Sequence, residues 1–277
     1  MRDLIKFESH KMKRQKWFYI SLAIMIAMLV ITAYAQKLIP GAISGAIPDD
    51  PETLEAMGLT PEEAAEMKEA MAQLKSEERG TFILGAASSA MYTLLSAVFV
   101  SIVVCEDYDQ QIVKNVFSRG YSRRSVYFSK AVCVFVSCTV MFIVIHLVAA
   151  LLAVLLFVMK EIDPAIWKNL AVIYLVCMAF NAMQLAVSSI IRKAGGSIAI
   201  CIVVPVLIGT LLGVVQTLLK IDSDKIMLSN YWLDSFLGAA ADLETSGKRL
   251  TEIAVCSGIY IALFVFLGEL FGRKAEA

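Results

Sequence analysis

Long, uninterrupted runs of apolar residues dominate the pattern of the chain. Six of these runs are long enough for a helix of about 20 residues to cross the hydrocarbon core of a membrane. They cover residues 17–39, 82–105, 126–159, 166–191, 197–219 and 251–272. The runs lack the alternation of apolar and polar positions that marks a membrane-spanning β-strand, and helices satisfy their own backbone hydrogen bonds in lipid. The pattern therefore predicts an all-α polytopic membrane protein with six transmembrane helices.

The composition agrees with this pattern. Hydrophobic residues make up 58% of the 277 residues, whereas a soluble domain is nearer half apolar. The first apolar run follows a basic segment and contains Ala33-Tyr34-Ala35, which resembles a signal-peptide cleavage site. The run is longer than the roughly 7–15 apolar residues of a signal peptide. We therefore expect it to remain as an uncleaved first span.

Lysine and arginine are distributed unevenly between the segments that link the runs. If the N-terminus is cytoplasmic, 15 of the 25 basic residues fall on the cytoplasmic side. They are Arg2, Lys6, Lys11, Lys13, Arg14, Lys16, Lys114, Arg119, Arg123, Arg124, Lys130, Arg192, Lys193, Arg273 and Lys274. Because cytoplasmic segments carry an excess of lysine and arginine, the pattern predicts that both termini are cytoplasmic.

The N-terminal segment has an amphipathic pattern of its own. Residues 1–16 mix apolar with basic residues, which predicts a helix lying on the inner membrane surface with its basic side on anionic headgroups. A plain basic flank that only sets the topology is the alternative. Residues 17–277 would then form the six-span domain.

Two longer segments lie on the opposite side in this topology. Within the insert 40–81, the sequence TPEE from Thr60 is typical of a helix start with proline at N1 and a capping box. It predicts an acidic amphipathic helix at 61–78, which is either a cap over an outer vestibule or a simple linking hairpin. The segment 226–250 is too apolar for water and too short to span. It is either re-entrant and buried in protein, or an interfacial aromatic helix.

Motifs for catalysis are absent from the sequence. There is no G-x-x-x-x-G-K-[ST] phosphate loop, no H-E-x-x-H and no G-x-S-x-G. The two histidines lie far apart, and the six cysteines, without a C-x-x-C pair, lie in or at the ends of apolar runs. We predict a protein that is not an enzyme, with no metal site, no catalytic residues and cysteines that pack between helices.

A few polar residues interrupt the spans, where polar groups are costly and face the bundle interior. They are His146, Asn181, Gln184 and Gln216, with Glu269 near the inner end of the last run. These residues either line a translocation path or hydrogen-bond between helices. Among them only His146 is both central in its run and titratable, which disfavours a proton-driven carrier.

The segment between the second and third runs is basic and amphipathic. It predicts a short helix at 110–118, with Asp109 as N-cap and Gly120 as stop. The apolar side chains of Ile112, Val113, Val116 and Phe117 fall on one side of this helix. Because so short a helix is marginal alone, we expect its apolar side to sit in a groove of another protein.

The same residues carry a family resemblance. Glu106 is followed by IVKNV at 112–116, SRGYSR at 118–123 and YFSK at 127–130. This order resembles the segment after span two in the permeases of ABC-2-type ABC transporters. In that family an acidic residue closes span two, a G-T-I-K-N-L-L-S-R-G-x-S-R type run follows, and Ser-Lys opens span three. Gln110-Gln111 stand here where Gly-Thr is common. With the N-terminal helix and six spans, the resemblance covers nearly the whole chain.

The resemblance implies a half-transporter with the ABC-2, type V exporter-like architecture in a bacterial plasma membrane. Two such subunits, identical or close paralogues, pair, and each binds a separate cytoplasmic ABC ATPase that holds ATP and Mg²⁺. The ATPase-coupling residues it implies are Ile112, Val113, Lys114, Val116, Phe117, Arg119 and Arg123, with Glu106 as the acid of the coupling loop. The chain is similar to Gram-positive exporter permeases for bacteriocins and phenol-soluble modulins, which implies export of amphipathic peptides.

Other functions fit parts of the pattern. An exporter of drugs or lipids, or an immunity permease, would use the same apolar surfaces. An ion-coupled carrier would not need the helix at 110–118, and a membrane anchor or sensor would not transport at all. We expect membrane lipid, but no nucleic acid, among the partners.

Overall fold

The computed structural model describes residues 2–46, 60, 63–67, 79–88, 90–110, 112–156, 164–218 and 228–274, and within these ranges it contains helices and no strands. The helices are α1 (Arg2–Arg14), α2 (Lys16–Ala46), α5 (Arg79–Ser88), α6 (Ala90–Asp109), α7 (Ile112–Ser118), α8 (Arg123–Leu156), α9 (Ile166–Ile191), α10 (Ala194–Leu218), the 3₁₀-helix η1 (Leu228–Tyr231), α11 (Leu233–Ala241) and α12 (Gly247–Lys274). The prediction of an all-α protein is thereby confirmed for the described residues.

Six helical stretches in the described part of the chain are long and apolar enough to cross a membrane. They are Lys16–Ile39, Gly80–Asp109, Arg123–Leu156, Ile166–Ile191, Ala194–Leu218 and Gly247–Phe271. These stretches match the six predicted runs in number and place. The second one continues one turn beyond its predicted end at Cys105, which has consequences for the segment that follows.

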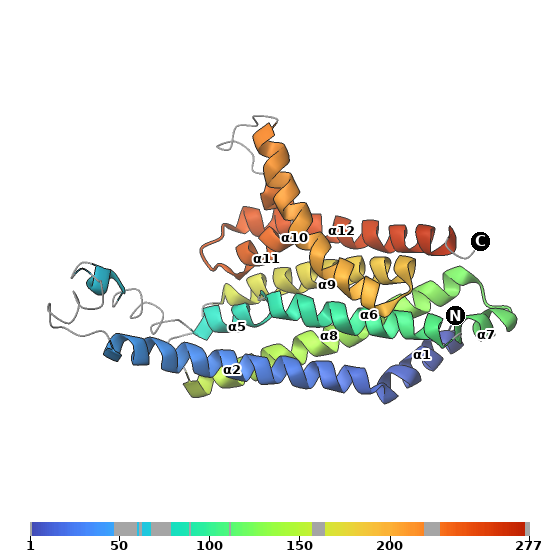
Figure 1. The fold of residues 1–277 in the computed structure, drawn as a ribbon, viewed down its shortest axis with the longest axis horizontal. Helices are drawn as coiled ribbons and strands as arrows, with labels where there is room; N and C mark the ends of the chain where they lie inside the picture. The colour runs from blue at the N-terminus through green and yellow to red at the C-terminus, as the bar shows by residue number, and fades with distance from the viewer. Residues whose placement is uncertain are drawn as a thin grey trace.

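Helix α9 occupies the centre of the bundle. It packs against α5, α6, α8, α10, α11 and α12, and Ile173, Cys177 and Phe180 on it are buried. The helix α10 crosses α9 and then extends away from the other long helices (Figure 1). Five of the six cysteines are buried, as expected for residues that pack between helices.

The two ends of the bundle carry different elements. The N-terminal helix α1, the short helix α7 and the C-terminal end of α12 lie at one end, which we call the α7 end (Figure 1). Helices α5 and α11 lie toward the opposite end, the α11 end. The gathering of both termini at one end agrees with the predicted topology, whereas the side of the membrane that this end faces stays a prediction.

The predicted helix start at Thr60 is present. The Thr60 N–H donates to Glu63 Oε2 at 2.9 Å, and the Glu63 N–H donates back to Thr60 Oγ1 at 3.3 Å, which is a capping box. The hydrogen bonds from the Thr60 backbone and hydroxyl lower the pKa of the Glu63 carboxyl. Residues 63–67 are helical, and the rest of the predicted helix at 61–78 lies outside the described residues.

The apolar segment before α12 folds as η1 and α11. The side chains of Trp232, Leu233 and Phe236 are buried, α11 packs against α9 and α5, and Trp232 Nε1 donates to the carbonyl of Pro205 at 2.8 Å. The described part of 226–250 is therefore covered by protein on its apolar side, as a re-entrant segment must be. Its depth in a membrane stays a prediction, and Ile226 and Met227 lie outside the described residues.

A close approach between α8, α9 and α12 generates the first testable prediction. A Cβ added to Gly268 would lie 3.0 Å from the Cα of Ala186 and too close to the Tyr127 hydroxyl, whereas a Cβ on Gly258 of the same helix would have open space. We expect Gly268→Ala to lower the free energy of unfolding by about 1–3 kcal/mol through overpacking, and Gly258→Ala to leave it unchanged or higher. Thermal unfolding of the two detergent-purified variants measures the difference, and equal melting temperatures would contradict the packing described.

Candidate functional site

The short helix α7 stands between two longer helices at the α7 end. Helix α6 continues to Asp109, and the Gln110 N–H donates to the Glu106 carbonyl at 2.9 Å. The prediction that Asp109 caps the short helix is therefore wrong, because Asp109 is the last residue of α6. Gly120 ends α7 as predicted: it adopts φ 83° and its N–H donates to the Phe117 carbonyl at 2.9 Å, a conformation that glycine adopts without strain.

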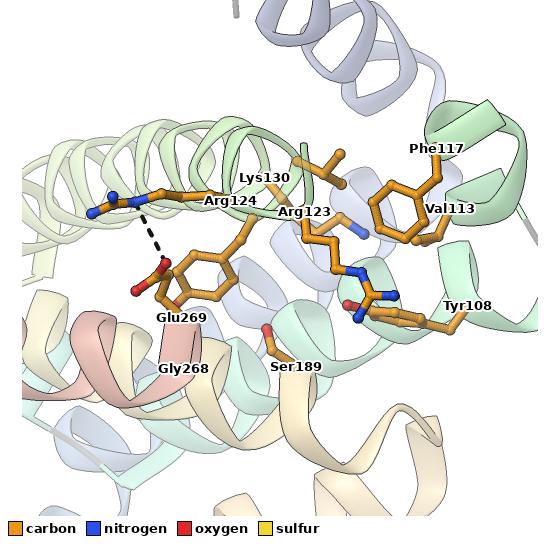
Figure 2. A pocket seen from close by; sticks show the side chains of 11 residues that line it. Tyr108, Val113, Phe117, Arg123, Arg124, Lys130, Ser189, Gly268 and Glu269 are labelled. Atoms are coloured by element: carbon orange, nitrogen blue, oxygen red, sulfur yellow. Dashed lines mark ion pairs between the residues drawn. The ribbon is translucent and has the colours of Figure 1, made fainter. Parts of the chain in front are cut away.

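The apolar side of α7 is divided between this chain and its surroundings. Val113, which is buried, and Phe117 line a small cavity of about 30 Å³ together with Tyr108 and Arg123 (Figure 2). Val113 is therefore covered by this chain, whereas Phe117 is only partly buried, and the docking of the apolar side in another protein stays a prediction. The other apolar residues of α7, Ile112 and Val116, are partly exposed and lie outside the lining of this cavity.

Cations and aromatic rings surround the short helix. The Arg123 guanidinium lies 5.8 Å from the centre of the Phe117 ring, and Arg192, which follows α9, lies 4.9 Å from the centre of the Tyr108 ring. At these distances a cation is attracted to the face of a ring. Lys114 and Arg119 are exposed. Three of the predicted coupling residues, Lys114, Arg119 and Arg123, are thus exposed cations on or next to the short helix.

A buried carboxylate at the end of α6 joins three helices. Asp107 Oδ2 lies 2.5 Å from Lys130 Nζ on α8, and its Oδ1 pairs with Lys11 Nζ on α1. The side chains of Asp107 and Lys130 are 3% and 6% exposed. Charges buried this deeply are tolerated only when paired, so each of the three helices has one favourable position relative to the other two.

A second contact fixes α1 beside this ion pair. Glu106 accepts hydrogen bonds from Gln15 Nε2 at 2.5 Å and from Gln110 Nε2 at 2.9 Å. Glu106, predicted as an acid of the coupling loop, is therefore part of the last turn of α6. Burial, and next the charge of Lys130, lower the pKa of Lys11, while Glu8 and Glu106 raise it. Two consecutive residues of α6 thus hold α1 and the link that follows it: Asp107 pairs with Lys11 of α1, and Glu106 with Gln15 between α1 and α2.

The beginning of α8 is also attached to the last helix. Arg124 Nε lies 3.4 Å from Glu269 Oε1 on α12, as Figure 2 shows, and the Tyr127 hydroxyl donates to the Val265 carbonyl at 3.1 Å. Helix α7 contacts α6 and, through Phe117, Arg123 of α8, and these two helices in turn contact α1 and α12. Among the described residues, groups of three or more His, Cys, Asp or Glu that could hold a metal ion are absent.

The four polar residues predicted for a translocation path are all buried. Gln184 Nε2 donates to the Thr93 carbonyl at 3.0 Å and to Ser96 Oγ at 3.2 Å. Gln216 Oε1 accepts from the Leu228 N–H at 3.0 Å, and His146 Nδ1 lies 2.8 Å from the Phe142 carbonyl. Asn181 is fully buried. These contacts agree with the alternative of hydrogen bonding within and between helices, and a shared path stays a prediction.

Sequence reasoning missed the roles of Asp107, Lys130 and Lys11. Asp107 follows the end of the second apolar run, and Lys130 lies near the start of the third. Opposite charges at the adjoining ends of two consecutive spans indicate an ion pair between them. The third partner gives no such signal, because Lys11 belongs to a segment rich in basic residues and only the packing of α1 on α8 brings it to the pair.

Comparison with known proteins places most of this site within one family model. Residues 76–274 match the model of a family described as "Protein of unknown function (DUF2705)". The matched region contains α7, Asp107 and Lys130, and it begins after α1. No curated protein matches the chain.

The buried ion pair generates the second prediction. In Asp107→Asn two buried ammonium groups lose their carboxylate, and we expect the free energy of unfolding to fall by about 3–5 kcal/mol. Thermal unfolding of the detergent-purified protein measures this loss. The matched control is Glu252→Gln, which breaks the partly exposed Arg249–Glu252 pair of 3.1 Å and should cost less than about 1 kcal/mol. Similar losses in the two variants would show that Asp107 is not buried as described.

Proposed function

The chain belongs to the DUF2705 family of proteins of unknown function, and we propose that it is the transmembrane permease subunit of an ATP-driven ABC exporter with ABC-2 architecture. The observation that carries the proposal is α7. This helix has seven residues, lies outside the six long apolar helices at the end that holds both termini, and presents aliphatic side chains amid cations. Such a helix is suited to a groove in another protein.

The division of the apolar side assigns the residues of α7 to two tasks. Val113 and Phe117 attach the helix to the rest of the chain, because their side chains lie beside Arg123 and Tyr108 around the small cavity. Ile112 and Val116 then remain for the partner, a cytoplasmic ABC ATPase that binds ATP and Mg²⁺. A helix of this length is marginal alone, so contacts on both sides stabilise it. The exposed Lys114 and Arg119 contact acidic groups of the ATPase.

The contacts of Asp107 explain how a movement of α7 reaches the bundle. When ATP brings two ATPases together, α7 moves with them and pulls on the end of α6. Because Asp107 holds Lys130 on α8 and Lys11 on α1, the three helices move together, and Arg124–Glu269 extends the movement to α12. The bundle is then a two-state element whose equilibrium nucleotide binding shifts.

The remaining parts of the proposal concern the assembly and the cargo. Two permease subunits, identical or close paralogues, form one exporter in a bacterial plasma membrane, with the α7 end in the cytoplasm. The cargo is an amphipathic peptide that enters from the cytoplasm or the inner leaflet. Large apolar side chains exposed on the long helices, such as Leu147 at 65% and Leu155 at 66%, give such a peptide an apolar surface to follow.

The third prediction concerns the docking side of α7. We expect Val116→Asp to lower the amount of ATPase that co-purifies with the tagged chain from its own host by at least about tenfold. A carboxylate buried in an apolar groove costs more than the roughly 1.4 kcal/mol that corresponds to this factor. Mass spectrometry identifies the partner by its G-x-x-x-x-G-K-[ST] loop, and ATP hydrolysis by the purified complex confirms it.

The control places the same charge change on the polar side of the same helix. Asn115 is exposed, and Asn115→Asp should retain at least half of the co-purifying ATPase. An unchanged yield of ATPase with folded Val116→Asp would exclude α7 as the docking element. Equal losses in both variants would show that charge on α7, rather than its aliphatic side, decides binding.

The fourth prediction tests the topology. Ser118 at the end of α7 and Glu244 between α11 and α12 are both exposed, and we expect them on opposite sides of the membrane. A membrane-impermeant maleimide should label Glu244→Cys in intact cells, and should label Ser118→Cys only in inside-out vesicles. The chain with its native cysteines alone is the control. Labelling of Ser118→Cys in intact cells would place the α7 end outside the cytoplasm and overturn the proposal.

A further inference from the structure

A second, larger cavity lies between α1, α2 and α8, away from the cavity beneath α7. It has a volume of about 330 Å³, and its lining includes Met12 and Lys13 of α1, Phe18 of α2, and Val132 and Val136 of α8. This volume falls in the range of small-molecule sites, which is roughly 300–1,000 Å³. The proposed coupling of α7 makes no use of this cavity.

The turn between α1 and α2 keeps the cavity open. The Gln15 N–H donates to the Met12 carbonyl at 3.1 Å, and the Phe18 N–H donates to the Gln15 carbonyl at 3.3 Å, so the chain bends sharply between the two helices (Figure 1). The side chain of Gln15 is held by Glu106 of α6, and the Tyr19 hydroxyl donates to the Lys13 carbonyl at 3.1 Å. These contacts fix the angle between α1 and α2, so the cavity is preformed.

The floor of the cavity continues into an apolar stripe on α8. The side chains of Val132, Val136 and Val140 line the cavity and are 41%, 58% and 43% exposed. Ile143 and Leu147 follow at helical spacing and are also exposed. At 1.5 Å per residue, the stripe from Val132 to Leu147 is about 22 Å long. An extended acyl chain placed in the cavity would therefore have an apolar path along α8 into the membrane.

The polar end of the cavity carries positive charge. Lys13 lines it and is exposed, and Ser9 lines it one helical turn earlier. The other exposed charged residues of α1 are Arg2, Asp3, Lys6 and Arg14. The exposed charge of α1 is thus mainly positive, because Glu8 is buried. Tyr19, which also lines the cavity, is an aromatic residue of the kind found at headgroup level.

We propose that this cavity binds an anionic phospholipid, with its phosphate at Lys13 and one acyl chain along Val132, Val136 and Val140. Cationic side chains next to an apolar surface attract anionic headgroups, and the stripe on α8 supplies the surface for the acyl chain. The site requires only that the six long helices span a membrane, so it goes beyond the proposed transport function and does not depend on it. The bound lipid holds the face of α1 that Asp107 does not hold, and it thereby stabilises the position of α1.

The test uses the full chain, delipidated in detergent, with phosphatidylglycerol and phosphatidylcholine as probes in native mass spectrometry. We expect phosphatidylglycerol to be retained in preference to phosphatidylcholine and to raise the melting temperature. Lys13→Glu should weaken phosphatidylglycerol binding at least about fivefold, the factor that corresponds to roughly 1 kcal/mol for one interfacial cation. Ser137→Phe, which fills the cavity without changing its charge, should also reduce binding.

The matched control is Lys168→Glu, the same charge change at an exposed lysine near the start of α9, which should leave binding unchanged. Equal retention of the two lipids, or equal effects of Lys13→Glu and Lys168→Glu, would overturn the proposal. Full binding by a folded Ser137→Phe variant would show that the acyl chain lies elsewhere. A co-purifying peptide in place of phospholipid would identify a different occupant and would also overturn it.

Discussion

One buried carboxylate, that of Asp107, determines the geometry of the α7 end. It pairs with lysines from α1 and α8 while it belongs to α6, so three helices share one small group of charges. A buried ion pair contributes little net stability compared with well-packed apolar residues, but the loss of one partner is costly. The pair therefore acts against alternative registers of these helices. Because α7 follows Asp107 within one turn and a short link, its position is fixed by the same group.

At the α7 end, helices α7 and α1 each have one face packed against the bundle and another face that is exposed. Helix α7 buries Val113, places Phe117 in the lining of the small cavity, and leaves Ile112 and Val116 partly exposed outside that lining. Helix α1 divides in the same way, with Leu4, Glu8 and Met12 buried and its basic residues mostly outside. Each of the two helices thus combines attachment to the bundle with exposed residues, which we propose bind a separate protein at α7 and an anionic lipid at α1.

Much of the fold follows from the sequence because a membrane limits the choices. Lipid requires helices of a minimum length, so the six long helices and the stop of α7 at Gly120 could be predicted from apolar runs and one glycine. The site was predictable only in part. Local pattern favours Asp109 as a cap, but α6 continues through it, and the contact between Gln15 and Glu106 joins residues 91 positions apart. The covering of Val113 likewise depends on Tyr108 and Arg123, whose packing the pattern of α7 does not contain.

The central claim is that a separate ATPase binds α7 and thereby changes the conformation of the helix bundle. A photo-crosslinking amino acid at Ile112, which is partly exposed and outside the small cavity, tests it in native membranes. The account predicts a covalent adduct with a protein that contains a G-x-x-x-x-G-K-[ST] loop, with a yield that changes when ATP is added. An adduct formed only with lipid, or with a protein on the outer side of the membrane, would contradict it.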